Sequence, residues 1–513
     1  MYRIILLTSL LIITSNIILF SQSEDDWFFL PDGLGFQNHL EYSFNVESKK
    51  EIFENWTNLD YTKGVFSAGV RFEAFQPNDP DPSINRGKVR YADIAYKYIS
   101  VDLGDFDKGV RLTAGNFYTL FGRGMILKSY EDRNIRIDNN LIGFKAEAHF
   151  YDFHLSALSG SAANSQNIRK DVLHAIDLSY RELNFLKAGI THAANLPDDE
   201  SLSKTSFTSM RLEPSIWNLD FYFEFAIKQN NDIKKNVFEN KESIVGKGFY
   251  GNANMYLGPF TFTGEYKLYD NFAFTSNDGT VIYNTPPSLR KEYTNQLLNR
   301  HPSPLDQSDE QGYQIEINYT LDDETNFQTS YGLTQTLPAS SYFQRINRFN
   351  LPVVTQFKEF FAQAYHSWNE NLNTTLSFGY NKELSSNTKN ITPVLENKFY
   401  FVDINTIKLI IEHQHTTNRI TSEKYYSDVL SIEYLRSPSF NVAWVTEVQT
   451  KEPEADRIIR KVWSFIQFGY KISSYADLSL LIGSRQAGNI CIGGVCRFEP
   501  EFRGIEFKML TRL

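Results

Sequence analysis

The sequence has 513 residues and a formal net charge of −10 at pH 7, and 15% of its residues are aromatic, including 41 Phe and 29 Tyr. The acidic balance argues against nucleic acid as a partner, because phosphate binding calls for a basic surface. Beyond residue 23, no stretch approaches the roughly 20 apolar residues that a membrane-spanning helix needs. Many aromatic residues without long apolar segments favour a barrel that shows rings to lipid and polar groups to its lumen.

The first 23 residues are typical of a secretory signal peptide. Arg3 supplies a positive charge, residues 4–20 form an apolar run with polar interruptions, and Ser21 and Ser23 are small residues at cleavage positions. We expect 1–23 to be removed on export and 24–33 to form a short periplasmic segment. That segment leaves no room for the N-terminal plug of a TonB-dependent transporter.

Alternation of apolar and polar residues is the strongest pattern along the chain. A strand with lipid on one face and water on the other must change chemistry at every residue. The alternation is clear in residues 34–46, 66–74, 217–228, 313–321 and 440–449. It predicts an all-β fold, a single large antiparallel transmembrane β-barrel of about 22–24 strands over residues 34–513.

Short and long connections alternate along the predicted strands. Tyr151-Asp152 and Gly258-Pro259 are tight turns, whereas 230–245 and the proline-containing stretch 271–311 are long. Outer-membrane barrels have tight periplasmic turns and longer extracellular loops, so we expect 271–311 to be a long external loop. The segmentation gives an odd number of strands. Either one strand near 118–140 is missed, or that stretch crosses the lumen.

The stretch 118–140 is the part of the barrel least compatible with lipid. Its charged residues give two interpretations. They pair with each other across the interior, because buried charges are usually paired, or they form a constriction or solute-binding surface, because rings of charge set pore selectivity. The candidate lumen residues are Arg123, Glu131, Asp132, Arg133, Arg136 and Asp138.

The two cysteines of the chain flank a predicted turn. Gly493-Gly494 suits a two-residue turn that requires positive φ, and this turn places Cys491 opposite Cys496 at a non-hydrogen-bonded pair. That spacing permits a disulfide, which an exported protein would keep oxidised. We expect it to staple the last external hairpin.

Catalytic and metal-binding signals are weak. His413 and His415 share one strand face, but no third metal ligand is identifiable. The sequence has no phosphate-binding glycine loop, nucleophile elbow or zinc-protease motif. We therefore expect no enzyme activity, no catalytic residues, no metal and no cofactor. A barrel-embedded hydrolase would require a Ser or Asp beside a His at the outer rim.

Three sequence runs carry a family resemblance: GNFYTLFGRGM at 115–125, SYEDRNIRIDNNLIGFKAE at 129–147 and GSRQAGNICIGGVCRFEPEFRGIEFK at 483–508. They resemble an uncharacterised family of outer-membrane barrel proteins from Bacteroidetes-type bacteria, over nearly the whole mature chain. The resemblance implies the barrel and a bacterial outer-membrane location. It implies no activity or catalytic residues.

Barrel size, the missing plug domain and the charged segment together predict a porin-like channel or solute transporter. The alternative is a structural or assembly component that docks a partner protein or surface polymer through its external loops. The expected partners are outer-membrane lipid, the barrel-assembly machinery during biogenesis, and a solute or protein whose identity the sequence does not give. No nucleic acid is expected.

Overall fold

The computed structural model describes residues 31–513 except 79–90, 106, 134–136, 165–167, 184, 200–203, 232–243, 290, 301–307, 338–353, 385, 402–403, 452–458 and 493–494. The predicted signal peptide, 1–23, and most of the segment 24–33 lie outside the described residues. Within the described part of the chain, no helix is long and apolar enough to cross a membrane.

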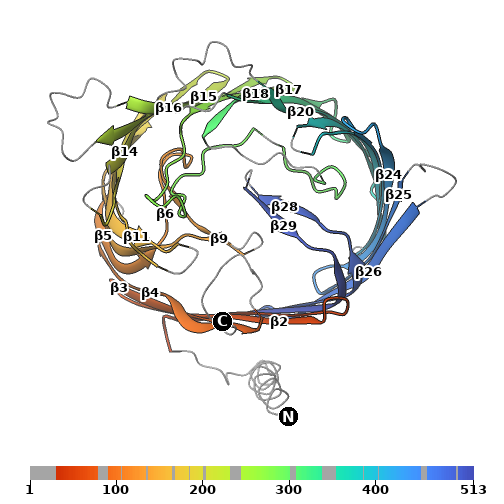
Figure 1. The fold of residues 1–513 in the computed structure, drawn as a ribbon, viewed down its shortest axis with the longest axis horizontal. Helices are drawn as coiled ribbons and strands as arrows, with labels where there is room; N and C mark the ends of the chain where they lie inside the picture. Colours follow the sequence, from red (N-terminus) through yellow and green to blue (C-terminus); the bar gives the residue numbers. More distant parts are fainter. Residues whose placement is uncertain are drawn as a thin grey trace.

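Twenty-four antiparallel strands form one closed barrel, in which each strand pairs with the next and β30 pairs with β1 (Figure 1). The predicted fold class is therefore confirmed. The wall strands are β1 (Leu34–Asn45), β2 (Lys50–Lys63), β3 (Phe66–Pro77), β4 (Tyr91–Gly104), β5 (Lys108–Phe117), β10 (Leu141–Phe150), β11 (Phe153–Ala162), β12 (Val172–Leu183), β13 (Leu186–Leu196), β14 (Lys204–Ile216), β15 (Leu219–Asn231), β16 (Ile244–Leu257), β17 (Phe260–Asp270), β18 (Asp309–Thr320), β19 (Thr325–Thr336), β20 (Val354–Asn369), β21 (Leu372–Glu383), β22 (Thr388–Phe401), β23 (Asn405–Asn418), β24 (Lys424–Arg436), β25 (Phe440–Lys451), β26 (Ile459–Ser473), β27 (Ala476–Arg485) and β30 (Phe502–Arg512).

The predicted alternation determines which face of the wall each side chain occupies. In β15, Phe223 and Phe225 are 38% and 50% exposed, whereas Tyr222 and Glu224 are 5% and 1% exposed. Large apolar side chains thus cover the outside of the cylinder, where hydrocarbon replaces water. The lumen face of the same strand is buried, so something inside the barrel must cover it.

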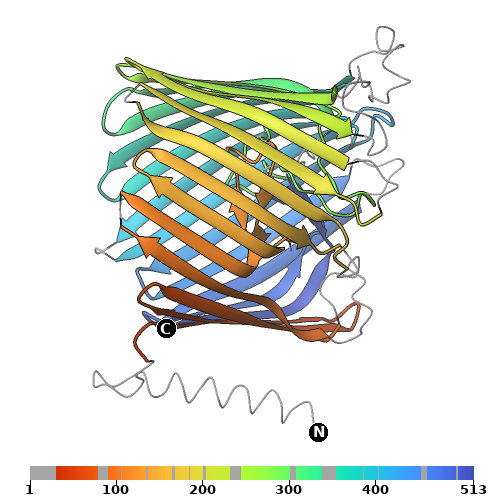
Figure 2. The same ribbon diagram turned by 90° about the vertical axis from the view of Figure 1, so that its left-hand side faces the viewer.

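The two ends of the barrel differ. At one end each turn between wall strands has two to four residues, and at the other end the connections reach 38 residues between β17 and β18. The C-terminus lies at the end with the tight turns (Figure 2). This asymmetry identifies the tight-turn end as periplasmic and the long-connection end as external.

Three short strand pairs lie off the wall. They are β6 (Thr119–Leu120) with β7 (Lys128–Ser129), β8 (Glu131–Asp132) with β9 (Ile137–Asp138), and β28 (Gly488–Ile492) with β29 (Val495–Glu499). The first two pairs belong to the stretch 118–140, which runs inside the ring in Figure 1. The described residues of that stretch supply no wall strand, and the wall has an even number of strands.

A charge on the lipid-facing side should destabilise the barrel. Phe225 lies at the middle of β15 and faces outward, so Phe225→Arg should cost about 2–4 kcal/mol of unfolding free energy in lipid, as Arg does at a bilayer midplane. Urea unfolding in liposomes measures this cost. Ile420→Arg, in an exposed external turn, is the matched control and should change stability little. Equal effects of the two substitutions would contradict the assignment of the outer face.

Candidate functional site

Two long segments enter the lumen from the external end, and the hairpin β28–β29 between β27 and β30 also projects inside the ring in Figure 1. The first inward segment is residues 118–140, between β5 and β10, and the second is residues 271–300, between β17 and β18. Figure 1 shows both inside the ring of wall strands. The second segment is the predicted long external loop, and that prediction is wrong for the described residues up to Arg300. Its side chains are apolar enough to be buried against the first segment rather than left in solvent.

Glycines allow the first inward segment to turn close to the wall. Gly122 has a φ of +55° and Gly124 a φ of +80°. A Cβ atom at Gly122 would lie 2.7 Å from a carboxylate oxygen of Glu224 in β15. A side chain is therefore unfavourable here both for backbone conformation and for space.

The tip of the first inward segment forms a hydrophobic core inside the barrel. Met125, Ile126 and Leu127 have no exposed surface. They belong to one cluster with residues of the second segment and of the wall strands β5 and β10–β17. The other large members are Phe117, Phe121, Leu141, Leu158, Leu173, Phe207, Tyr222, Tyr250, Tyr269, Phe272, Phe274, Val281, Tyr283 and Leu289. The lumen face of this part of the wall is thus dry.

Asn284 joins the two inward segments. Its side-chain oxygen accepts a hydrogen bond from the Phe274 amide at 2.9 Å, and its nitrogen donates to the carbonyls of Met125 at 3.0 Å and Phe272 at 3.1 Å. The backbone amide of Lys128 also donates to the Tyr283 carbonyl at 2.8 Å. Asn284 is completely buried, and no sequence pattern distinguished it from other asparagines in long connections.

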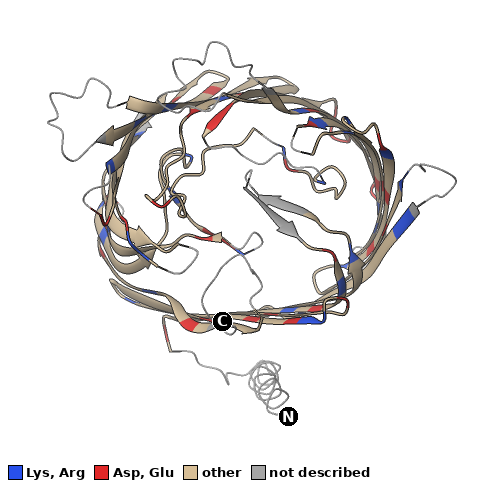
Figure 3. Ribbon diagram, viewed as in Figure 1, with Lys and Arg blue, Asp and Glu red and all other residues tan. Residues whose placement is uncertain are grey.

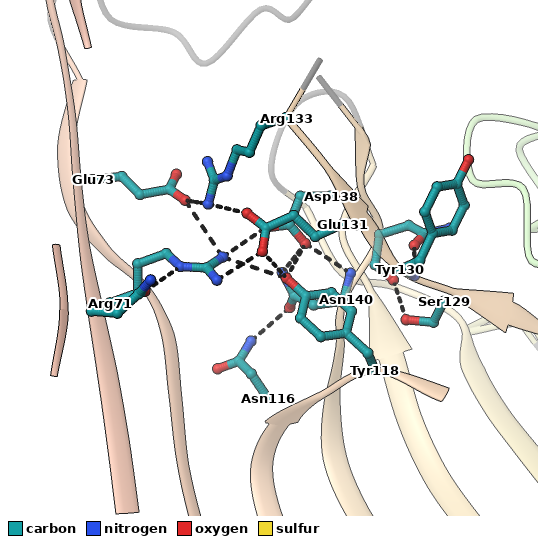
Figure 4. Close-up of polar contacts among 12 residues, drawn as sticks. Arg71, Glu73, Asn116, Tyr118, Ser129, Tyr130, Glu131, Arg133, Asp138 and Asn140 are labelled. Atoms are coloured by element: carbon teal, nitrogen blue, oxygen red, sulfur yellow. Dashed lines mark hydrogen bonds and ion pairs between the residues drawn. The ribbon is translucent and has the colours of Figure 1, made fainter. Parts of the chain in front are cut away.

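Charged residues follow the whole ring and also mark the inward segments (Figure 3). Near the wall strand β3, five of them form a network that Figure 4 shows in close-up. Arg71 contacts Glu131 at 2.8 Å and Asp138 at 3.5 Å, and Arg133 contacts Glu73 at 3.0 Å and also Glu131. The charges of the first segment therefore pair mainly with the wall, where burial makes an unpaired charge costly.

Tyr118 lies within this network. Its hydroxyl contacts Asp138 at 3.0 Å and Glu131 at 3.4 Å, and its ring stacks on Tyr96 at 5.3 Å between centroids. Burial and the two nearby carboxylates raise the pKa of the Tyr118 hydroxyl. The hydroxyl therefore stays protonated and donates a hydrogen bond to a carboxylate.

The predicted lumen residues separate into two places. Glu131, Arg133 and Asp138 belong to the network at β3, whereas Arg123 lies 4.3 Å above the Tyr222 ring and donates to the Tyr250 hydroxyl at 3.1 Å. Asp132 is half-buried in β8. Arg136 lies outside the described residues. Arg133 and Glu131 pair with each other as the first interpretation predicts, but the other ion pairs of the described residues join the segment to Arg71 and Glu73 of the wall. A role in solute selectivity stays a prediction.

The far end of the second inward segment docks on the opposite wall. The backbone amides of Gln296 and Leu297 donate to the Glu412 carboxylate at 3.0 and 2.7 Å. Arg300 makes two hydrogen bonds, of 2.7 and 2.8 Å, to the Glu447 carboxylate. Both carboxylates are almost fully buried. Such two-pronged Arg–carboxylate contacts are geometrically specific, so this end has one defined position.

Polar cavities remain on the periplasmic side of the inward segments. One of about 630 Å³ is bounded by Tyr118 to Phe121 and by charged wall residues of both signs. The charged residues are Asp102, Arg111, Lys145, Glu147, Asp177 and Arg181, and His149 and His154 also line the cavity. A second, of about 260 Å³, lies below Thr294 and Asn295 and is lined by Asn326, Gln363, Thr375 and Ser377 among others.

The hairpin β28–β29 places Cys491 directly opposite Cys496 in the strand register, as predicted. The side chains of residues 489–499 are not among those that the structure describes, so the disulfide itself stays a prediction. Unreduced protein should be lighter than reduced protein by two hydrogen atoms in an intact-mass measurement. Equal masses would contradict the disulfide.

A closed cylinder with an apolar outer face and opposite ends of unequal connection length defines a bacterial outer-membrane β-barrel protein. Residues 32–513 match the model of a family of unknown function (DUF6029), and the chain belongs to that family. The family description does not give a bacterial group, so the Bacteroidetes origin stays a prediction. No curated protein matches the chain.

Several solved structures share the barrel architecture. The P pilus usher PapC translocation pore has 9% identity and a TM-score of 0.46, with 93% of this chain and 98% of that chain covered. Pseudomonas aeruginosa OpdK has 12% identity, a TM-score of 0.39 and coverages of 75% and 98%. The P. aeruginosa siderophore receptor PirA has 10% identity, a TM-score of 0.45 and coverages of 95% and 81%. These similarities are too low to assign a function.

Loss of the Asn284 side chain should loosen the second inward segment. Asn284→Ala leaves a buried amide and two carbonyls without their partner, and each such group costs about 1–3 kcal/mol. We expect faster amide hydrogen exchange at 272–285, with wall strands unaffected. Asn371→Ala, in a periplasmic turn where the amide donates to the Tyr400 carbonyl, is the control. Unchanged exchange at 272–285 would show that Asn284 does not hold the segment.

Proposed function

We propose that the protein is a channel for small polar solutes, in which the two inward segments narrow the lumen. The observation that carries this proposal is the cavity of about 630 Å³ beneath the first inward segment, whose lining includes six charged side chains. Its volume falls within the range of small-molecule sites. A barrel of this strand number is wide enough to conduct unless its lumen is filled.

The lining of this cavity favours solutes that carry polar groups of both kinds. Asp102 pairs with Arg111, and Lys145 contacts Glu147 at 2.8 Å and the Tyr118 carbonyl at 3.3 Å. Acidic and basic groups are therefore interspersed, so no single sign of charge dominates the wall. We infer weak selectivity between small cations and anions.

Removal of the second inward segment should widen the pathway. Asp270 and Asp309 are paired in the wall, so a short Gly-Ser turn can replace residues 272–307 without opening the barrel. Planar-bilayer recordings should show a small conductance for the natural chain and a conductance several-fold larger for this deletion. Shortening the connection 232–243 in the same way is the control and should leave the conductance unchanged.

If neither the natural chain nor the deletion variant passes ions at any voltage, although both migrate as folded barrels, the protein is not a channel. Equal conductance of the natural chain and the deletion variant would be consistent with a channel but would contradict the narrowing role of the second inward segment.

A further inference from the structure

Lysine side chains form a row across five neighbouring strands at the external end of the barrel. Lys358 of β20 is directly opposite Lys382 of β21, and Lys382 is directly opposite Lys389 of β22. Lys389 is opposite Thr417 of β23, which is opposite Lys424 of β24. Residues directly opposite each other in a sheet have Cβ atoms about 4.5–5.5 Å apart. We call this set the lysine row.

The lysine row faces outward, toward the membrane. In β21 the outward positions Leu376 and Phe378 are 55% and 40% exposed, and Lys382 shares their face. The neighbouring positions Asn381 and Glu383 are buried in the lumen. The same parity holds on the adjacent strands, where Phe357, Glu359, Asn390, Thr416 and Ser427 are the buried, lumen-facing neighbours.

Like charges directly opposite each other destabilise a sheet, yet the described part of the chain supplies no counter-charge to the lysine row. Among the described residues, no carboxylate lies within ion-pair distance of any of the four ammonium groups. The nearest outward carboxylate down these strands, Asp428, pairs with His413 at 2.7 Å. Lys358 and Lys389 lie over ring faces, those of Tyr331 at 5.5 Å and Tyr380 at 5.7 Å.

The same barrel neutralises another opposed lysine pair with its own acids. Lys398 and Lys408 are directly opposite each other in β22 and β23, near the periplasmic end. Glu396 lies 3.2 Å from Lys398 and 3.4 Å from Lys408, and Glu433 lies 3.8 Å from Lys408. Lys398 and Lys408 share the lumen face with the buried Val394 and Ile410, whereas the lysine row faces outward. Among the described residues the lysine row lacks an arrangement of this kind, so it is open to a counter-charge from outside the chain.

The position of the lysine row identifies the source of that charge. The outward residues one step nearer the membrane centre are Tyr331, Phe360, Tyr380, Ile391, His415 and Tyr426. A band of aromatic rings marks the interface between hydrocarbon and headgroups in outer-membrane barrels. Four ammonium groups just beyond such a band lie at the height of the lipid headgroups of the external leaflet.

We propose that the lysine row binds the phosphate groups of an anionic lipid headgroup in the external leaflet. Lysine binds phosphate as a compact point charge, and neighbouring ammonium groups at cross-strand spacing can share one phosphorylated headgroup. The acyl chains then lie along the aromatic and aliphatic side chains below the row. The site orients the barrel in the membrane and is independent of what passes through the lumen.

Native mass spectrometry of the detergent-solubilised full chain tests this site. The probes are dioleoyl phosphatidic acid, dioleoyl phosphatidylcholine with the same acyl chains, and inorganic phosphate as a competitor. The test variant is Lys358→Gln, Lys382→Gln and Lys389→Gln together. The control replaces three exposed lysines near the periplasmic end, Lys63, Lys187 and Lys471, by Gln. Both variants have the same net charge.

The natural chain and the control should retain phosphatidic acid in preference to phosphatidylcholine. The test variant should lose at least about tenfold in retained phosphatidic acid, because each basic side chain at an anionic membrane surface contributes on the order of a fivefold change in binding. Inorganic phosphate should not displace the lipid. The single variant Lys382→Gln, with an intermediate loss, replaces the triple variant if the latter does not fold.

Three results would overturn the proposal. They are equal retention of phosphatidic acid by the test variant and the natural chain, equal retention of the two lipids by the natural chain, or displacement by inorganic phosphate, which would indicate a site for the free ion. Conductance should be the same in all folded variants, so the channel proposal and the lipid site fail separately.

Discussion

Hydrogen bonding of the backbone within hydrocarbon is the constraint on which the rest of this structure depends. No water is present there to satisfy N–H and C=O groups, so the sheet must close on itself. The pairing of β1 with β30 completes that closure. Closure imposes alternation on the wall: outward side chains such as Phe225 meet lipid, and inward ones such as Glu224 need polar partners or cover inside the cylinder.

The width of the barrel creates a second structural requirement: groups other than the wall side chains must fill the lumen. A ring of 24 strands encloses more space than wall side chains can fill, and two external connections fold back into it. Around Ile126 and Phe272 they form a cluster of buried apolar side chains, as in the interior of a soluble protein. Docking at Glu412 and Glu447 fixes the far end of the second segment. Space is left for polar cavities on the periplasmic side.

The sequence was sufficient to predict the strands of the wall, but it was insufficient to predict how the segments in the lumen pack. Apolar and polar residues alternate in segments such as 217–228, which indicates a strand with one face toward lipid and one toward water. This pattern predicted the strands, the turns and the closed barrel. Packing between two loops leaves no periodic signal. Residues 271–311 contain prolines and therefore resembled an external loop, although Phe272 and Phe274 are fully buried. The partners of Glu131 and Arg133 lie in β3, some 60 positions away, beyond any local pattern.

The functional interpretation depends on inward segments that are folded inside the barrel. Labelling with a membrane-impermeant maleimide tests it in a chain with Cys491→Ser and Cys496→Ser. A single cysteine replaces either the buried Ile126 or the exposed Thr294 in turn. We predict rapid labelling at position 294 and none at position 126 until the protein is denatured. Equally rapid labelling of both positions in the folded barrel would contradict the claim.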